Sequence, residues 1–229
     1  MAGTLQQPDT EHRKGATIMI ASHARAALLL AMAALLLAGP AFSQDADEEG
    51  FIPLFDGKTL DGWEATGAAD WTVEEGVLIG KQGEGNTPGD LWTTETFGDF
   101  ELQVTFKVVW PANSGLWFRS NPPDALGYQV DILDLKEYGC TVGTIYCDGF
   151  LSQNLDESIV NLDDWNTITL KAVGYELNVD LNGHEVANVV DEQERFAEGK
   201  IGWQVHAGDQ YADMRIMVKE CKIKPLGEE

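Results

Sequence analysis

The sequence is poor in basic residues. It carries 15 Lys and Arg against 38 Asp and Glu, which gives a formal net charge of −23 at pH 7. A surface with this excess of negative charge repels the phosphates of nucleic acids and of anionic lipids. We therefore expect no nucleic-acid partner and no anionic membrane partner, whereas a neutral ligand such as a sugar is compatible with the charge.

The sequence also has few residues that bind transition metals or form disulfides. Its 229 residues include four histidines and only three cysteines, Cys140, Cys147 and Cys221. None of them has the paired spacing of a zinc site, and no acidic loop has the ligand spacing of a calcium site. We therefore predict no metal and no cofactor. In an exported protein Cys140 and Cys147 are expected to close a small loop as a disulfide, with two free thiols as the alternative.

No apolar run is long enough to span a bilayer comfortably, which takes about 20 residues. The longest run, residues 26–39, follows Arg25 and precedes the small residues Ala41 and Ser43, an arrangement typical of a signal peptide. An uncleaved N-terminal anchor is the alternative. The predicted organisation is a signal peptide over 1–43 (with Met19 as an alternative start), an acidic linker over 44–50 and one domain over 51–229. We expect export to the periplasm or the cell exterior, without membrane attachment after cleavage.

Helical periodicity is absent after residue 43. Only residues 191–199, DEQERFAEG, are compatible with one or two helical turns. Short alternating segments separated by turn residues predominate, and Asn182-Gly183 between two of them is a strong hairpin signal. The last segment changes phase, which predicts a bulge near Glu220. The pattern predicts an all-β fold, either a sandwich or a barrel.

Three predicted strands carry polar residues on the face opposite their apolar residues, because successive side chains of a strand alternate between faces. In GYQVDILD (127–134), NSGLWFRS (113–120) and IGWQVHAG (201–208), this face comprises Gln129, Asp131, Gly115, Trp117, Arg119, Gly202, Gln204 and His206. A surface built only for solubility would more often use Lys, Glu and Thr. The coincidence of the three faces predicts a binding site.

Each residue of this face also has a plainer interpretation. Arg119 alone is typical of a surface salt bridge, Asp131 of its partner, and His206 of a side chain that hydrogen-bonds a loop. Trp117 is different, because alternation turns its large ring away from the core. We predict that Trp117 is a platform for a sugar ring.

Motifs along nearly the whole chain after residue 43 resemble the 3-keto-disaccharide hydrolase domain family. They are, in order, GFIPLFDGKTLDGW (50–63), WTVEEGVLIG (71–80), FGDFELQVTF (97–106), NSGLWFRS, GYQVDILD, GTIY (143–146), WNTITL (165–170), LNG (181–183), IGWQVHAG and IKPL (223–226). The resemblance implies a concanavalin-A-like jelly-roll β-sandwich of two antiparallel sheets. It also implies a concave face that receives sugar, and activity on 3-keto-glycosides.

The resemblance assigns site residues as well. They are Asn113, Ser114, Arg119, Gln129, Asp131, Tyr146, Gln204 and His206. Three positions depart from the family pattern. The strand that usually carries Glu and then Gln has Gln129 and then Asp131, so its carboxylate is moved by two residues and shortened, and Trp203 replaces a usual Leu.

The chemistry that the family implies needs few groups. A ketone at C3 of a sugar acidifies the C2 proton, so a base can remove this proton, the C1 substituent leaves, and water adds. One base and one stabiliser of the enolate oxygen replace the carboxylate pair of ordinary glycosidases. We predict His206 or Asp131 as the base, Arg119 as the enolate stabiliser and Tyr146 as the acid for the leaving oxygen. The predicted substrate-binding residues are Gln129, Gln204, Trp117, Asn113 and Ser114.

The sequence thus predicts an exported enzyme that cleaves 3-keto-disaccharides by elimination or hydrolysis at the C1–O bond. Two alternatives stay open. A non-catalytic carbohydrate-binding module of the same fold is favoured by the altered carboxylate position. A structural or adhesion domain would have no pocket on the polar face.

Overall fold

The computed structural model describes residues 47, 49–124 and 126–227. The predicted signal peptide and most of the predicted linker lie outside these residues, so cleavage and export stay predictions. Within the described ranges, no helix has the length and hydrophobicity needed to cross a membrane.

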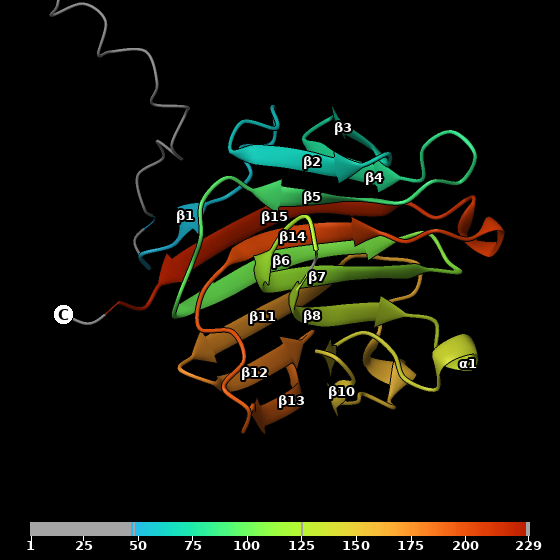
Figure 1. The fold of residues 1–229 in the computed structure, drawn as a ribbon. Helices are drawn as coiled ribbons and strands as arrows, with labels where there is room; N and C mark the ends of the chain where they lie inside the picture. Colours follow the sequence, from blue (N-terminus) through green and yellow to red (C-terminus); the bar gives the residue numbers. More distant parts are fainter. Residues whose placement is uncertain (1–46, 48, 125, 228–229) are drawn as a thin grey trace, which may run out of the picture. The chain divides into compact units, whose positions relative to one another are not determined.

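The fold consists of two antiparallel sheets that lie one over the other (Figure 1). The order of the eight-stranded sheet is β13-β12-β11-β6-β15-β4-β3, with β1 paired to β15. Its strands are β1 (Ile52–Pro53), β3 (Asp70–Glu74), β4 (Val77–Lys81), β6 (Phe100–Val108), β11 (Asn166–Val173), β12 (Glu176–Leu181), β13 (His184–Val190) and β15 (Ile216–Pro225). The all-β prediction with two antiparallel sheets is confirmed.

The seven-stranded sheet carries the predicted polar face. Its order is β10-β9-β8-β7-β14-β5-β2. Its strands are β2 (Trp63–Gly67), β5 (Gly89–Thr93), β7 (Asn113–Asn121), β8 (Leu126–Leu133), β9 (Thr144–Tyr146), β10 (Phe150–Ser152) and β14 (Lys200–Val205). The strands β7, β8 and β14, which were singled out by their alternation, are neighbours in the middle of this sheet.

The core lies between the sheets and follows from strand alternation. On β6 every second residue from Phe100 to Val108 is buried, as the sequence predicts. Phe106 of this strand packs against Trp203 of the opposite sheet, with ring centroids 6.4 Å apart. Burying one such side chain stabilises the fold by roughly 1.5–3 kcal/mol. The apolar residues of β7, β8 and β14 pack in this core, and the opposite face of these strands carries the polar side chains.

Two predicted backbone irregularities are confirmed. Asn182 and Gly183 join β12 to β13 with φ angles of 52° and 82°, as a tight hairpin turn requires. The register between β15 and β6 shifts between Val218 and Glu220, which is the bulge expected near Glu220.

Residues 191–199, whose sequence is compatible with one or two helical turns, do not form a helix. The Asp191 carboxylate accepts hydrogen bonds from the backbone N–H groups of Gln193 and Arg195, both at 3.2 Å. Glu194 adopts a left-handed φ of 50°, which no helix accommodates. A polar side chain that binds the local backbone therefore replaces the helix.

The described chain instead contains a short helix that the sequence pattern did not predict. The helix α1 spans Leu135–Tyr138, begins at Asp134, whose side chain caps Lys136 N, and ends at Gly139 with a φ of 71°. Two single turns of 3-10 helix, η1 and η2, cover Glu157–Ile159 and Asp209–Tyr211. Four residues are too few for the sequence to show a helical period.

The predicted disulfide is not formed, because Cys140, Cys147 and Cys221 are all free and buried. A turn closed by a Thr144 N to Thr141 O hydrogen bond follows Cys140, and β9 then runs outward from it. The three residues of β9 extend the chain by about 10 Å, whereas the Cα atoms of a disulfide lie within about 7 Å. An extended strand directly before Cys147 agrees with the two free thiols that were the alternative.

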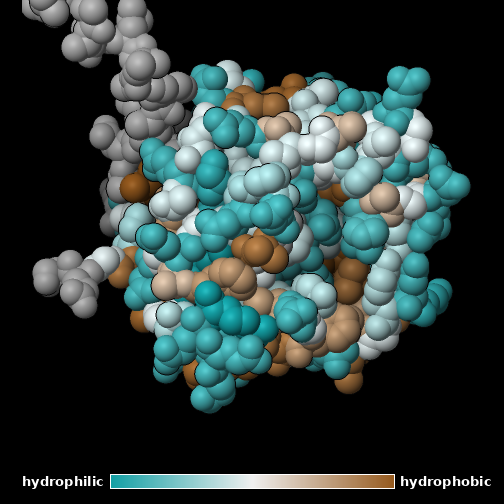
Figure 2. Space-filling model, viewed as in Figure 1, coloured by the Kyte–Doolittle hydropathy of each residue, from teal (hydrophilic) through white to brown (hydrophobic). Residues whose placement is uncertain are grey.

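The surface agrees with the composition. Viewed as in Figure 1, it is mostly hydrophilic, with small and separate apolar areas (Figure 2).

Candidate active site

A pocket opens on the polar face of the seven-stranded sheet, with a volume of about 370 Å³. Its lining residues are Asn113, Trp117, Gln129, Asp131, Leu133, Tyr138, Tyr146, Phe150, Gln204 and His206. Seven of the nine predicted site residues line this pocket, and Arg119 and Ser114 do not. A structural or adhesion domain is expected to have no pocket on the polar face, so this pocket disfavours that alternative.

Strand register brings the site residues together. In one row across the sheet, Gln204 of β14 is opposite Gly115 of β7, which is opposite Asp131 of β8. In the next row, Trp117 of β7 is opposite Gln129 of β8. Neighbouring strands lie about 4.8 Å apart, so side chains of both rows can reach one ligand.

Two glycines keep the sheet surface free for larger side chains. A Cβ atom on Gly115 would lie 2.3 Å from Nε2 of Gln129, and one on Gly202 would lie 2.4 Å from Cε3 of Trp92. The Gln129 amide and the Trp92 indole therefore lie flat across the backbone of the neighbouring strand. Only glycine leaves space for this arrangement.

Asp131 is the most unusual group in the pocket. Its side chain is 5% exposed, and its carboxylate accepts no hydrogen bond from the described residues. Burial raises the pKa of Asp131 to about 7. The carboxyl group can therefore both take up and release a proton near neutral pH.

Gln129 presents an unpaired donor. The residue is 5% exposed, and its Nε2 atom has no hydrogen-bond partner among the described residues. Buried amide N–H groups are rarely left unpaired, and an unpaired one in a pocket is a group that a ligand can satisfy.

His206 follows the end of β14 and projects into the pocket from an ordered loop. Its Nδ1 atom lies 2.7 Å from the Ala207 carbonyl oxygen. A carbonyl only accepts, so Nδ1 donates this hydrogen bond and Nε2 is not used by it. The side-chain amide of Gln82 donates to the carbonyls of His206 and Gly208, at 2.7 and 3.0 Å, and so fixes the loop.

Trp117 is held by a carboxylate that the sequence reasoning missed. Its Nε1 atom donates to Oδ1 of Asp90 at 3.1 Å, and its ring lies 6.1 Å from that of Trp92. Burial raises the pKa of Asp90 to about 6, although the Trp117 hydrogen bond and the charge of His206 oppose the rise. Alternation in GDLWT (89–93), with Asp90 and Trp92 on the polar face, was the signal that could have revealed it.

Tyr138 was also not predicted as a site residue, because it belongs to the short helix α1. Its hydroxyl oxygen accepts a hydrogen bond from Nδ2 of Asn113 at 2.7 Å and lies 2.5 Å from the hydroxyl oxygen of Tyr211. Burial keeps the pKa of Tyr211 above its usual range, so Tyr211 stays protonated. The three side chains form a fixed wall of the pocket.

Arg119 is not part of the pocket, which corrects its predicted place on the polar face. Relative to both neighbouring strands, β7 has one extra residue after Phe118, and Arg119 lies there with a φ of 48°. Its side chain is fully buried. The guanidinium binds Asp99 at 2.9 Å and donates to the carbonyls of Gly98, Gly174 and Phe196. The bulge interrupts the alternation on which the prediction depended.

Ser114 is likewise turned away from the pocket. It is fully buried, and its hydroxyl donates to the Gln204 carbonyl at 2.6 Å. In alternation with Asn113 and Gly115, it belongs to the core face of β7. Its predicted role in substrate binding is therefore corrected to a structural one, in which it ties β7 to β14.

Tyr146 and Gln204 lie where the sequence predicts. Tyr146 at the end of β9 is partly exposed and meets the ring of Phe150 edge to face, with centroids 5.8 Å apart. Gln204 lies in register between Asp90 and Gly115 and lines the pocket. Both have polar atoms directed at the same space as Asp131.

The pocket offers neutral donors rather than a fixed cation. No Lys or Arg is among its lining residues in the described chain. In the same part of the chain, no group of three or more His, Cys, Asp or Glu side chains is placed to hold a metal ion. Trp117 lines the pocket but is only 7% exposed, so it offers a ligand an edge rather than the open platform that the sequence predicts. The arrangement suits an uncharged polyhydroxylated ligand that meets one protonatable carboxyl group.

Comparison with known proteins supports this description. Residues 50–224 match the family of 3-keto-alpha-glucoside-1,2-lyase-like domains. A curated relative, the 3-keto-disaccharide hydrolase of Bacteroides thetaiotaomicron, is 35% identical over 81 residues, which cover 31% of this chain and 28% of that protein. The match thus spans less than a third of the length of the relative.

Solved structures share the fold at low sequence identity. A candidate glycosyl hydrolase from Parabacteroides distasonis has a TM-score of 0.61 and 22% identity, over 77% of this chain and 99% of that chain. A protein of unknown function with a galectin-like fold from Bacillus subtilis has a TM-score of 0.59 and 13% identity, over 76% and 94%. These likenesses show the jelly-roll fold that the sequence motifs imply.

Proposed function

Because the chain belongs to the family of 3-keto-alpha-glucoside-1,2-lyase-like domains, we propose that it cleaves 3-keto-glycosides at the C1–O bond. The observation that carries the proposal is Asp131, a buried carboxyl group with a pKa raised to about 7 by burial. It lies in a pocket that also contains aromatic side chains and the unpaired Nε2 of Gln129. Such a carboxylate is a suitable base for the C2 proton of a 3-keto sugar.

The proposed reaction has two stages. Asp131 takes the proton from C2, and the electrons pass into the enolate at C3. The enolate then collapses, C3 regains its ketone, a C1–C2 double bond forms, and the C1–O bond breaks while Tyr146 gives its proton to the leaving oxygen. Water next adds to C1 with loss of a proton to Tyr146, and Asp131 returns its proton to C2.

The enolate oxygen requires a stabiliser other than Arg119, whose guanidinium is bound elsewhere. The unpaired Nε2 of Gln129 is the donor that the pocket offers for this purpose. His206, whose Nδ1 is used by the Ala207 carbonyl, has its Nε2 left to form a hydrogen bond with a sugar hydroxyl. Donors that are held in place by the fold stabilise a developing oxyanion effectively.

The first test is Asp131→Asn, which keeps the shape of the side chain and removes the base. With a 3-keto-disaccharide as substrate, we expect kcat to fall by about 100-fold or more. In the wild type, kcat/KM should rise with pH through about 7, because only the ionised carboxylate accepts the proton. Chromatography of the released sugar measures both effects.

The comparison variant is His206→Ala, for which we expect a smaller loss, about tenfold, expressed mainly in KM. Wild-type turnover by Asp131→Asn would contradict the assignment of the base. A pH profile that is flat between 5 and 8 would contradict it as well.

One observation favours a second candidate function, the binding of carbohydrate without cleavage. With Arg119 turned away, the described pocket has no fixed cation for the enolate. A binding module would hold the 3-keto-disaccharide and its unoxidised counterpart with similar affinity and release no sugar from either. Calorimetry with both ligands, combined with the turnover assay, separates the two functions.

A further inference from the structure

A second pocket of about 470 Å³ adjoins the candidate active site. It is lined by Trp117, Leu126, Gly127, Tyr146, Cys147, Asp148, Arg195 and Phe196. The two pockets share Trp117 and Tyr146, so one ligand can extend from the first into the second. Both volumes lie within the range of about 300–1,000 Å³ that is usual for small-molecule sites.

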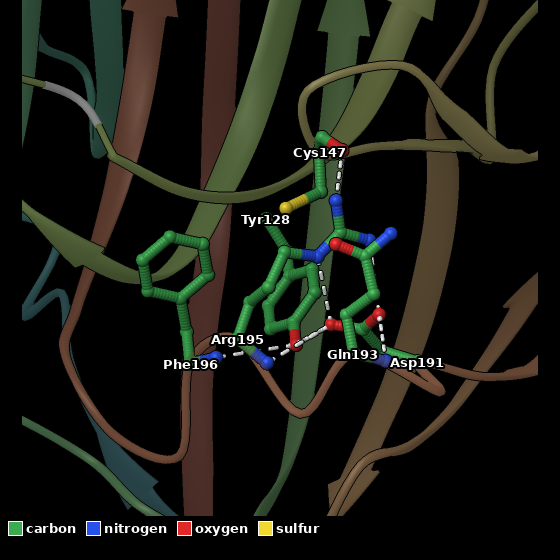
Figure 3. Close-up of polar contacts among 6 residues, drawn as sticks. All are labelled: Tyr128, Cys147, Asp191, Gln193, Arg195 and Phe196. Atoms are coloured by element: carbon green, nitrogen blue, oxygen red, sulfur yellow. Dashed lines mark hydrogen bonds and ion pairs between the residues drawn. The ribbon is translucent and has the colours of Figure 1, made fainter.

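The second pocket contains an arginine that is held in one orientation (Figure 3). Nε and Nη2 of Arg195 donate to the two carboxylate oxygens of Asp191, at 3.0 and 2.9 Å. Nη1 donates to the Cys147 carbonyl at 2.7 Å. The Tyr128 hydroxyl donates to the same carboxylate at 2.7 Å. A paired and anchored guanidinium loses little conformational entropy when it binds a ligand.

Arg195 retains donors that nothing in the described chain uses. A guanidinium has five N–H groups, and the three bonds above leave one on Nη1 and one on Nη2. The side chain is 18% exposed, so a ligand can reach it. Burial alone would raise the pKa of Asp191, but the hydrogen bonds from Arg195 and Tyr128 hold that pKa below its usual range. Both partners of the ion pair therefore stay ionised, and their charges cancel.

The chemistry of this pocket suits a neutral sugar ring. Directed donors without net positive charge favour hydroxyl groups over anions, and the exposed carboxylate of Asp148 supplies an acceptor for hydroxyl protons. Phe196, which is half-buried, offers aromatic surface for the apolar face of a ring, and Trp117 adds the 7% of its surface that stays exposed. The net charge of −23 also disfavours an anionic ligand.

We propose that the second pocket binds the leaving sugar of a 3-keto-disaccharide. The inference rests on the proposed function, in which Tyr146 protonates the leaving oxygen. Since Tyr146 lines both pockets, the glycosidic oxygen belongs at their boundary, with the oxidised ring beside Asp131 and the second ring beside Arg195.

The test fills the second pocket without disturbing the Arg195 ion pair. Leu126 is 58% exposed, so Leu126→Trp adds bulk to the pocket and leaves the core intact. We expect KM for a 3-keto-disaccharide to rise about tenfold or more, and KM for methyl 3-keto-glucoside, which has no second ring, to change by less than about twofold. Asp148→Ala should raise KM for the disaccharide alone. Leu155→Trp, at a 65% exposed position outside both pockets, is the matched control.

Each outcome decides one question. If Leu126→Trp affects both substrates equally or neither, the second-sugar site is wrong, and the proposed function stands. If the wild type cleaves neither substrate, the proposed function is wrong, and calorimetry with the unoxidised disaccharide and methyl glucoside tests whether the second pocket binds a sugar ring. The site is supported if the wild type binds the disaccharide more tightly than methyl glucoside and Leu126→Trp removes this difference. It is overturned if the wild type binds the two ligands equally.

Discussion

The side chain of Asp131 illustrates how a functional residue opposes folding. An ionised carboxylate that is buried without hydrogen-bonding partners is less stable than the same group in water. The raised pKa of about 7 expresses this cost, because the folded protein prefers the protonated form. A catalytic carboxylate of this kind is therefore expected to reduce stability at the pH where it acts.

This cost predicts a pH-dependent stabilisation by Asp131→Asn. The pKa of Asp131 is about 7 in the folded state and about 3.9 in an unfolded chain, so stability falls as pH rises through this window. Asparagine has no charge to bury. The free energy of unfolding of Asp131→Asn should therefore equal that of the wild type at pH 4 and exceed it by at most about 4 kcal/mol at pH 8. Urea unfolding at both pH values measures it, with Asp134→Asn at a less buried site as the control, and an equal effect at both pH values would contradict the cause.

For individual residues, the sequence predicted correctly which side chains line the pocket wherever the alternation of the strand is regular. Trp117, Gln129, Asp131, Gln204 and His206 line one pocket, as their shared face predicted. Ser114 came from the family motif against its own alternation, and the structure shows alternation to be the better guide. Alternation could have placed Asp90 on the polar face, but its hydrogen bond to Trp117 could not be predicted, since the bond depends on the register of strands that are far apart in sequence.

Among the elements, β7 and its bulge decide what Arg119 does. The guanidinium connects the turn before β6, the turn between β11 and β12, and the segment before β14, through Gly98, Gly174 and Phe196. Asp99 accepts from Arg119 and also from the backbone N–H of Gly174, both at 2.9 Å. Arg119 is thus a link between the two sheets.

Replacement of Arg119 should therefore affect stability rather than catalysis. Arg119→Met leaves three buried carbonyl groups without their donor and should lower the free energy of unfolding by about 3–5 kcal/mol. For the folded fraction at low temperature, kcat/KM should stay within about threefold of the wild type. Urea titration and turnover assays test both parts. A 100-fold loss of kcat with unchanged stability would restore the enolate role to Arg119.

The elements also show where prediction from sequence ended. Long strands such as β6 and the Asn182-Gly183 hairpin were predictable because the signals are local. The extra residue at Arg119 has no local signal, since its left-handed φ is imposed by tertiary contacts. Helix α1 is too short for periodicity, although its caps Asp134 and Gly139 are visible in the sequence.

On the scale of the whole molecule, charge is the dominant property. A net charge of −23 places many like charges within a screening length of one another, and that length is about 10 Å at 0.1 M salt. We expect Tm to rise between low salt and 0.5 M NaCl, and to rise equally in KCl, because screening does not distinguish the two salts. Turnover of a neutral sugar should change little. A Tm that falls with salt would contradict the dominance of repulsion.

The single extra residue in β7 couples chain length to the link between the two sheets. Up to Phe118 the strand has its odd-numbered side chains on the pocket face, and at Arg119 the same strand connects to the opposite sheet. Arg119 and Ser120 together lie opposite the one residue between Leu126 and Tyr128 of β8, so a deletion of either would let β7 pair regularly, with Phe118 still opposite Tyr128. Homologues that are one residue shorter at this point can therefore keep the same pocket residues and yet lack the arginine that links the sheets.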